Sequence, residues 1–135
     1  MATGVEYKSS NESKAKHRVL IVEDELFIAL DLEETVKAMG FDVAGLASGQ
    51  DQALKLASLA DIAFVDVNLS DGPTGPEIGR RLVEEFGVTV VFMTGNPEAV
   101  ANRLNGALGV VTKPAMPATV QRTLEQAADA RRSLN

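Results

Sequence analysis

The stretch Ile62–Asp66, which reads IAFVD, decides the fold of this chain, because it is an apolar run that ends in a single acid. Three other apolar runs also end in polar groups: residues 19–22 are followed by Glu23 and Asp24, residues 88–93 by Thr94 and Gly95, and residues 108–112 by Lys113 and Pro114. Continuously apolar runs are typical of strands buried in a parallel sheet. The carboxyl ends of such strands form the edge where binding sites lie. The sequence therefore predicts one polar site built from four strand ends.

Composition limits the classes of protein to consider. The chain has 135 residues, 45% of them hydrophobic, which fits one globular domain with a substantial core. Its net charge of −6 argues against nucleic acid as a direct ligand, because phosphate backbones select basic surfaces. The absence of cysteine excludes disulfides and thiolate metal sites. With no transmembrane stretch and no signal peptide in the sequence, we expect a cytoplasmic protein that does not act at a membrane.

Domain organisation follows from the order of patterns. Residues 1–16 are polar and without apolar period, so we interpret them as a flexible arm. From residue 17 to 135, strands and helices alternate, which is the signature of a parallel α/β sheet. We expect a flavodoxin-like, doubly wound sheet of five strands in the order 2-1-3-4-5 with five helices. The expected strands are 19–22, 41–46 (at an edge of the sheet), 62–67, 88–93 and 107–112.

Caps and apolar stripes predict five helices between and after the strands. The first helix is expected over residues 26–39, with Gly40 as a left-handed cap. The second is expected to begin at Ser48 with Asp51 as a capping pair, and the third to begin with a capping box of Thr74 and Glu77. The side chains expected to face the core are Leu54 and Ala57 in the second helix, Ile78, Leu82 and Phe86 in the third, Val100 and Leu104 in the fourth, and Val120, Leu124, Ala127 and Ala128 in the last, which starts at Pro117.

The chemistry of the site follows from its charges. Carboxylates that crowd together raise one another's pKa, so the cluster needs a cation at neutral pH. Oxygen ligands with open positions suit Mg²⁺. Asp66 stands on the central strand, where a carboxylate can attack phosphorus and form an acyl phosphate. Lys113 would pair with a phosphoryl oxygen, while the Thr94 hydroxyl and the Gly95 N–H would donate hydrogen bonds to others.

Simpler interpretations exist for each residue taken alone. Glu23 and Asp24 fit an acidic cluster that complements a helix dipole. Asp66 fits a strand-terminal cap, Thr94 a turn hydroxyl and Lys113 a surface lysine. Each of these is reasonable in isolation, but their arrival together at four strand ends favours a phosphate site.

In these residues the sequence resembles a receiver domain of a two-component response regulator. The matching pattern is an acidic pair after the first strand (Glu23, Asp24), a phospho-accepting aspartate (Asp66), a switch hydroxyl (Thr94) and Lys113–Pro114; it extends over residues 18–131. The resemblance implies phosphorylation of Asp66 by a sensor histidine kinase or phosphotransfer protein. It implies Mg²⁺ bound by Asp24, Asp66 and the Asn68 carbonyl, with Glu23 reaching the metal through water. The Lys113–Pro114 bond is often cis in such proteins, which the sequence alone does not show.

The sequence departs from the commonest receiver pattern at Val110. Receivers often carry an aromatic residue where this chain has Val110, so an aromatic rotamer switch is excluded. We expect the signal to leave through Thr94 and the following segment toward a downstream protein target. The segment Phe92–Asn96 is similar to a subgroup of stand-alone receivers with a Phe-Ala-Thr-Gly motif. The resemblance implies a signalling switch with slow self-phosphorylation and self-dephosphorylation, rather than an enzyme that acts on other substrates.

Two alternatives share parts of this pattern. A small Mg²⁺-dependent phosphatase with an aspartyl-phosphate intermediate would need an acid two residues after Asp66, where this chain has Asn68. A flavodoxin-type electron carrier would need a Ser-, Thr- or Gly-rich loop after the first strand. Three consecutive acids, Glu23 to Glu25, stand there and would repel a flavin phosphate.

Overall fold

The computed structural model describes residues 17–100, 102 and 106–133. The expected arm of residues 1–16 and the expected core residue Leu104 lie outside these described residues. Within them, no helix is both long and apolar enough to cross a membrane.

Five parallel strands form one sheet in the order β2-β1-β3-β4-β5, as predicted. Their bounds are Arg18–Val22 (β1), Asp42–Ala47 (β2), Ile62–Asp66 (β3), Thr89–Thr94 (β4) and Gly109–Thr112 (β5). The continuously apolar runs lie where the sheet is buried on both faces: all five residues of β3 are buried. β2 is an edge strand, as expected from its lower apolar content, and its pairing with β1 shifts register between Val19 and Leu20.

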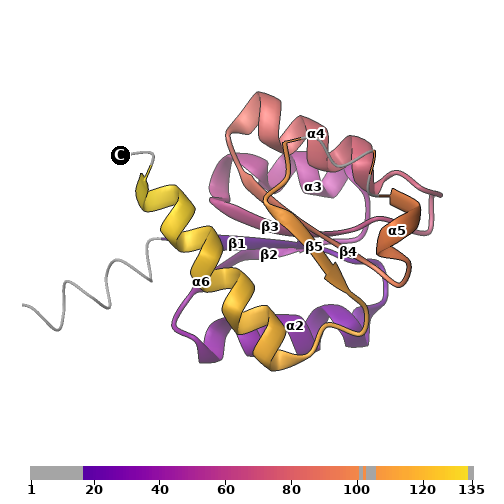
Figure 1. Cartoon of the computed structure of the whole chain (residues 1–135). Helices are drawn as coiled ribbons and strands as arrows, with labels where there is room; N and C mark the ends of the chain where they lie inside the picture. The colour runs from indigo at the N-terminus through magenta and orange to yellow at the C-terminus, as the bar shows by residue number, and fades with distance from the viewer. Residues whose placement is uncertain (1–16, 101, 103–105, 134–135) are drawn as a thin grey trace, which may run out of the picture.

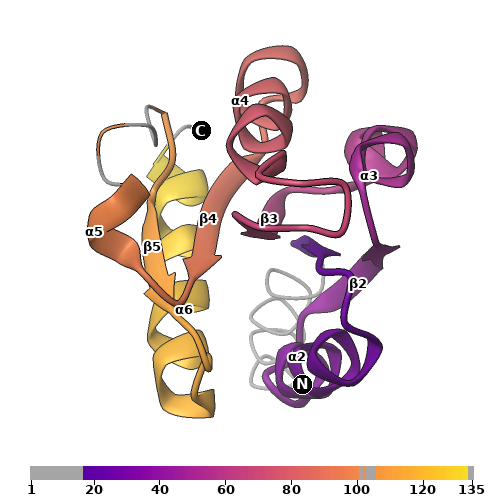
Figure 2. The ribbon, with the colours of Figure 1, turned by 90° about the vertical axis from the view of Figure 1, so that its right-hand side faces the viewer.

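Helices cover both faces of the sheet (Figures 1 and 2). Their bounds are Leu26–Ala38 (α2), Gln50–Leu56 (α3), Gly75–Phe86 (α4), Pro97–Val100 (α5) and Pro117–Ser133 (α6), with a 3-10 turn at Ala57–Leu59 (η1). α2 and α6 pack on one face, with buried side chains such as Val36 and Leu124 against Phe64. α3, α4 and α5 pack on the other, where Ile78, Leu82 and Val100 belong to the same buried cluster as Val65. Two apolar layers thus hold the sheet between them.

The first and last helices agree with the sequence prediction. α2 ends as expected, because Gly40 has a positive φ of 90° and stops the helix. α6 begins at Pro117 and buries the four predicted side chains, Val120, Leu124, Ala127 and Ala128.

The capping predictions for α3 and α4 are wrong. Gly49 precedes α3, and Ser48 instead donates from its N–H and hydroxyl to the Gln52 side chain. Thr74 precedes α4, but its hydroxyl donates to Asp71 at 2.7 Å rather than capping the helix. In both cases the hydroxyl donates to a side-chain oxygen three or four residues away, and no side chain of the described residues accepts a hydrogen bond from the first helical N–H groups.

Two predicted core positions are also wrong. Ala53, rather than Leu54, is the buried residue of α3, with Ala57 buried just after it as predicted. Phe86 is 39% exposed at the end of α4, where Gly87 turns the chain back toward β4 with a φ of 68°.

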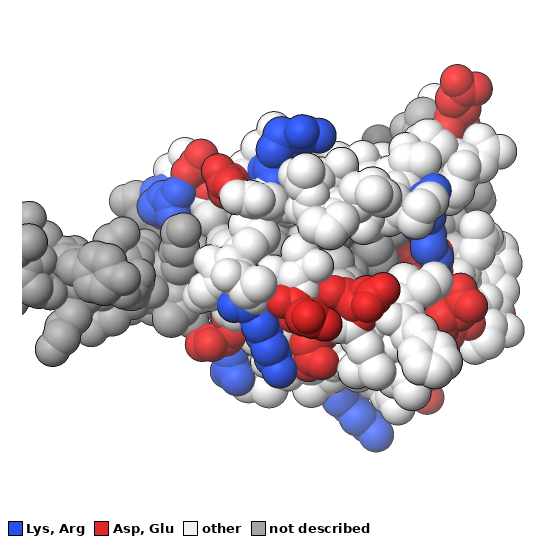
Figure 3. Space-filling model, turned by 90° about the horizontal axis from the view of Figure 1, so that it is seen from below, with Lys and Arg blue, Asp and Glu red and all other residues white. Residues whose placement is uncertain are grey.

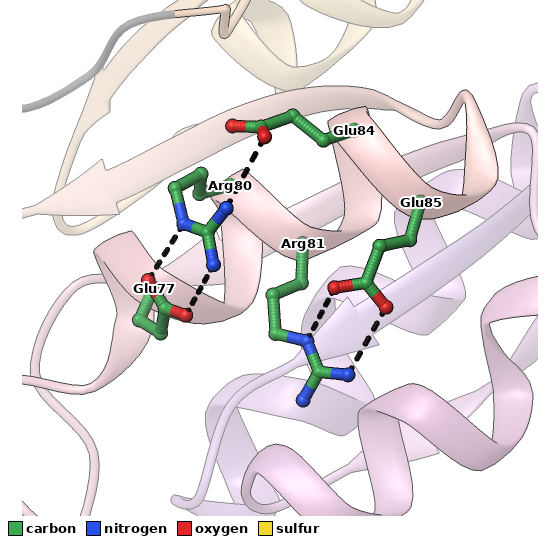
Figure 4. Close-up of polar contacts among 5 residues, drawn as sticks. All are labelled: Glu77, Arg80, Arg81, Glu84 and Glu85. Carbon is green, nitrogen blue, oxygen red and sulfur yellow. Dashed lines mark hydrogen bonds and ion pairs between the residues drawn. The ribbon is translucent and has the colours of Figure 1, made fainter.

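The outward face of α4 carries paired charges (Figure 4). Arg80 forms ion pairs with Glu77 at 2.6 Å and with Glu84 at 3.2 Å, and Arg81 pairs with Glu85 at 2.7 Å. The pairs lie three or four residues apart, where helical side chains meet. The hydrogen bonds raise the pKa of Arg80 and lower that of Glu77. Because these side chains are exposed, the pairs contribute little to folding.

Candidate functional site

The predicted site residues meet at the carboxyl edge of the sheet. Glu23 and Asp24 follow β1, Asp66 ends β3, Thr94 ends β4 and Lys113 follows β5. Main-chain hydrogen bonds continue the sheet past the strand ends and fix these positions. They run from the N–H of Glu23 to the Ala47 carbonyl (2.9 Å), from Val67 to Met93 (3.0 Å) and from Lys113 to Thr94 (2.9 Å).

Lys113 joins the two most buried acids of the site. Its ammonium donates to Glu23 Oε1 at 3.0 Å and to Asp66 Oδ2 at 2.8 Å. The Glu23 and Asp66 side chains are 0% and 5% exposed, and the Lys113 side chain is 21% exposed. The remaining oxygens are also bonded: Glu23 Oε2 accepts the Glu25 N–H, and Asp66 Oδ1 accepts the Asn68 N–H.

Burial and charge act against each other in this cluster. Burial raises the pKa of Glu23, and the neighbouring Asp66 adds to that rise, while the Glu25 N–H and Lys113 oppose it. Burial lowers the pKa of Lys113, but its hydrogen bonds with Asp66 and Glu23 outweigh burial, so the net pKa is raised. Lys113 is therefore held in its charged form, whereas its charge does not fully offset the effect of burial on Glu23.

The donor set fits a divalent cation. Glu23, Asp24 and Asp66 each offer a carboxylate oxygen, and these oxygens lie within 4.8 Å of one another. Hard oxygen ligands are those that Mg²⁺ prefers, and its remaining positions are usually filled by water or phosphate. Asp24 is only partly buried and can reach such a cation from the solvent side.

The other predicted site residues lie around this cluster. Thr94 is 2% exposed, and its hydroxyl accepts the Asn96 N–H at 3.1 Å. Gly95 and Asn68 are exposed on the loops that follow β4 and β3. The Lys113–Pro114 peptide bond is cis. Val110 of β5 pairs with Phe92 of β4, and its side chain is 37% exposed at the surface of the sheet edge.

Gly75 is a positioning residue that the sequence interpretation missed. A Cβ at Gly75 would overlap the carbonyl of Asp66 and stand 2.6 Å from the Cα of Val67. The first turn of α4 therefore lies directly against the strand end that carries Asp66. A signal was present in the sequence: Gly75 and Gly79 are four residues apart in a helical pattern, and glycine inside a helix usually has a packing reason.

The fold and the site define the class of this protein: a doubly wound α/β domain with an acidic, lysine-bridged cluster at the carboxyl edge of its sheet. Residues 19–125 match the response regulator receiver domain family, and the chain belongs to it. Receiver domains take part in two-component signalling.

Named relatives agree with this assignment. The chain is 36% identical over 114 residues to the phyllosphere-induced regulator PhyR of Methylorubrum extorquens, covering 81% of this chain and 42% of the relative. It is 33% identical over 103 residues to the aerobic respiration control protein ArcA of Escherichia coli, covering 73% and 43%. The chain therefore spans less than half the length of these two relatives.

Solved structures agree as well. The receiver domain of Erythrobacter litoralis PhyR superposes with a TM-score of 0.76 at 33% identity, covering 84% of this chain and 90% of that one. The response regulator PhyR of Brucella abortus superposes with a TM-score of 0.79 at 28% identity, covering 96% and 55%.

Replacing Glu23 with glutamine is expected to raise the urea midpoint of unfolding near neutral pH in metal-free buffer. The folded pKa of Glu23 lies above its ordinary value of 4.5, so its ionisation disfavours the folded state as pH rises through the folded pKa. The advantage of Glu23→Gln should shrink as pH falls through the folded pKa of Glu23, below which the wild-type carboxyl is protonated. Glu25→Gln removes the same charge from an exposed neighbour and is the control. A lower midpoint for Glu23→Gln than for Glu25→Gln would contradict this expectation.

Proposed function

We propose that this protein accepts a phosphoryl group on Asp66 from a sensor histidine kinase or phosphotransfer protein and passes the signal to a protein partner. One observation carries the proposal: a single ammonium, that of Lys113, lies within 3.0 Å of both Glu23 and Asp66 in a buried acidic cluster. That arrangement holds a cation beside a nucleophilic carboxylate, which is what transfer of a charged phosphoryl group needs.

The transfer follows from the geometry of the cluster. An Asp66 carboxylate oxygen forms a bond to phosphorus while the bond from phosphorus to the donor's histidine nitrogen breaks, and that nitrogen keeps the electron pair and takes up a proton. Lys113 moves its hydrogen bond from Asp66 Oδ2 to a phosphoryl oxygen. Thr94 donates its hydroxyl to another. Mg²⁺ held by Asp24, Asp66 and the Asn68 carbonyl, with Glu23 behind it, would offset the charge on the phosphoryl oxygens.

The signal would leave the site through Thr94. The Thr94 carbonyl accepts the Lys113 N–H, so β4 and the segment after β5 are joined at the point where the hydroxyl would turn toward the phosphoryl group. Phosphorylation adds roughly −1.5 to −2 charges there, enough to bias a loop with two conformations. The surface formed by α5, β5 and α6 would change, and a downstream protein would bind it.

The proposal is tested by incubating the protein with acetyl phosphate and Mg²⁺ and weighing it intact by mass spectrometry. Wild type is expected to gain one phosphoryl group, and Asp66→Asn to gain none, because the amide is a poor nucleophile. Asp71→Asn makes the same chemical change in the same loop, at an exposed carboxylate bonded to Thr74, and should be phosphorylated like wild type. An unmodified wild type, or a modified Asp66→Asn, would refute the proposal.

A second assay, hydrolysis of a small phosphate ester, separates a switch from a phosphatase. The residue two positions after Asp66 is Asn68, whose side chain cannot act as a general acid. We therefore expect no sustained hydrolysis of a small phosphate ester beyond the slow loss of the protein's own phosphoryl group.

A further inference from the structure

A groove between α2 and α6 extends away from the candidate site, with which it shares Lys113 and Pro114 at one end. It has a volume of about 820 Å³ and runs along α2 to the segment after β5. Its floor is apolar: Leu32 and Met93 are buried, while Ile28, Met39 and Ala115 are partly buried. A cavity of this size with a mostly apolar floor lies in the range of small-molecule sites, roughly 300–1,000 Å³.

The rim of the groove is negatively charged. Asp31 and Glu34 stand on the α2 side and Glu125 on the α6 side, and all three are exposed. None forms an ion pair with a lysine or arginine of the described residues. Figure 3 views the molecule from this side and shows acidic side chains gathered near the middle of the face.

One basic side chain, Lys113, lines the end of the groove nearest the site. Its charge is already offset, because its ammonium bonds to both Glu23 and Asp66. The three rim carboxylates therefore determine the sign of the field in the groove. A cleft lined by one sign of charge over apolar walls concentrates ligands of the opposite sign.

We propose that this groove binds a small cationic amphiphile, an ammonium or amidinium group carried on an apolar body. The apolar part would cover Leu32 and Met93 on the floor, and the cation would lie between the carboxylates of α2 and α6. Anions of the same shape would be repelled by the rim. The inference goes beyond the proposed function, because such binding needs neither phosphorylation nor a bound metal.

The first test is a charge series on the unphosphorylated protein, followed by two-dimensional amide NMR. The probes are 4-phenylbutylamine, 4-phenylbutanol and 4-phenylbutanoate, which share an apolar body and differ in charge. The amine is expected to shift amide signals of residues lining the groove, such as Leu32, Ala115 and Gln121, and to bind about tenfold more tightly than the carboxylate. Equal affinity of amine and carboxylate, or shifts only elsewhere, would overturn the proposal.

The second test removes the rim charges. In Glu34→Gln/Glu125→Gln the amine should bind about fivefold more weakly, in keeping with the loss of two exposed charge contacts. Both side chains are exposed, so the fold should be retained. Asp51→Asn/Glu98→Gln removes two exposed charges from α3 and α5, outside the groove, and should leave binding unchanged. Equal loss in this control and in Glu34→Gln/Glu125→Gln would show bulk charge alone and refute the site.

The third test distinguishes other occupants. Sedimentation of the protein without ligand should give a monomer whose groove amides still respond to the amine. A dimer whose groove amides fail to respond would show that a second copy fills the groove, and would refute the small-molecule proposal.

Discussion

Gly79→Ala is expected to destabilise the protein by about 2–3 kcal/mol, as overpacking of a filled core does. A Cβ at Gly79 would overlap the ring of Phe92 and stand 2.7 Å from its Cε1 atom. The ring is 2% exposed and belongs to β4, so it has little room to move. Alanine is favoured over glycine in a helix by about 1 kcal/mol, but the overlap is the larger effect. Urea unfolding at neutral pH measures the loss.

A second substitution tests whether the overlap with the Phe92 ring causes the loss of stability in Gly79→Ala. Phe92→Leu removes ring atoms that meet the new Cβ, so the double variant should lose less stability than the two single variants together, with a coupling of about 1 kcal/mol or more. Gly109→Ala is the matched control, because its added Cβ meets no atom within 4 Å. A Gly79→Ala protein as stable as wild type, or a double variant with additive losses, would contradict this account of the α4–β4 contact.

The sheet could be predicted from the sequence because its signal is local. Strands buried on both faces are continuously apolar, as at Ile62–Asp66, and their order in the chain fixes which polar residues follow them. The sheet then carries Glu23, Asp66, Thr94 and Lys113 to one edge whatever the details of the helices. Identifying the strands was therefore enough to predict that these four residues lie together.

The helix caps could not be predicted because a neighbouring side chain competes for the same hydroxyl, and the close contacts could not be predicted because they join separate elements of the sheet and helices. The Thr74 hydroxyl donates to Asp71 and the Ser48 hydroxyl donates to Gln52. The capping rule had paired Thr74 with Glu77 and Ser48 with Asp51. Gly75 and Gly79 matter through atoms of β3 and β4 that only the folded chain brings near. The ion pairs of Lys113 likewise join residues 90 and 47 positions apart.

Lys113 is the other position where a substitution should change stability strongly, because its ammonium bonds to two buried acids. Lys113→Met keeps most of the apolar stem but removes the ammonium from two buried acids. We expect it to lower the free energy of unfolding by about 3 kcal/mol at neutral pH in metal-free buffer, because an unpaired buried charge remains. Lys37→Met, which removes an exposed ion pair with Glu33 at 3.5 Å, should lose less than about 0.5 kcal/mol.

The pH dependence of that loss identifies its origin. The pKa of Glu23 is already raised above 4.5 by burial, and without Lys113 it should rise further. Glu23 then takes up a proton as pH falls through its raised folded pKa, and the deficit of Lys113→Met should shrink. The folded pKa of Lys113 lies above 10.5, so its stabilisation is complete below 10.5 and is lost as pH rises through the folded value. The deficit should therefore be largest between these limits. Urea unfolding of both variants across this range checks it, and a deficit independent of pH would mean that packing of the lysine stem, rather than its charge, holds the cluster together.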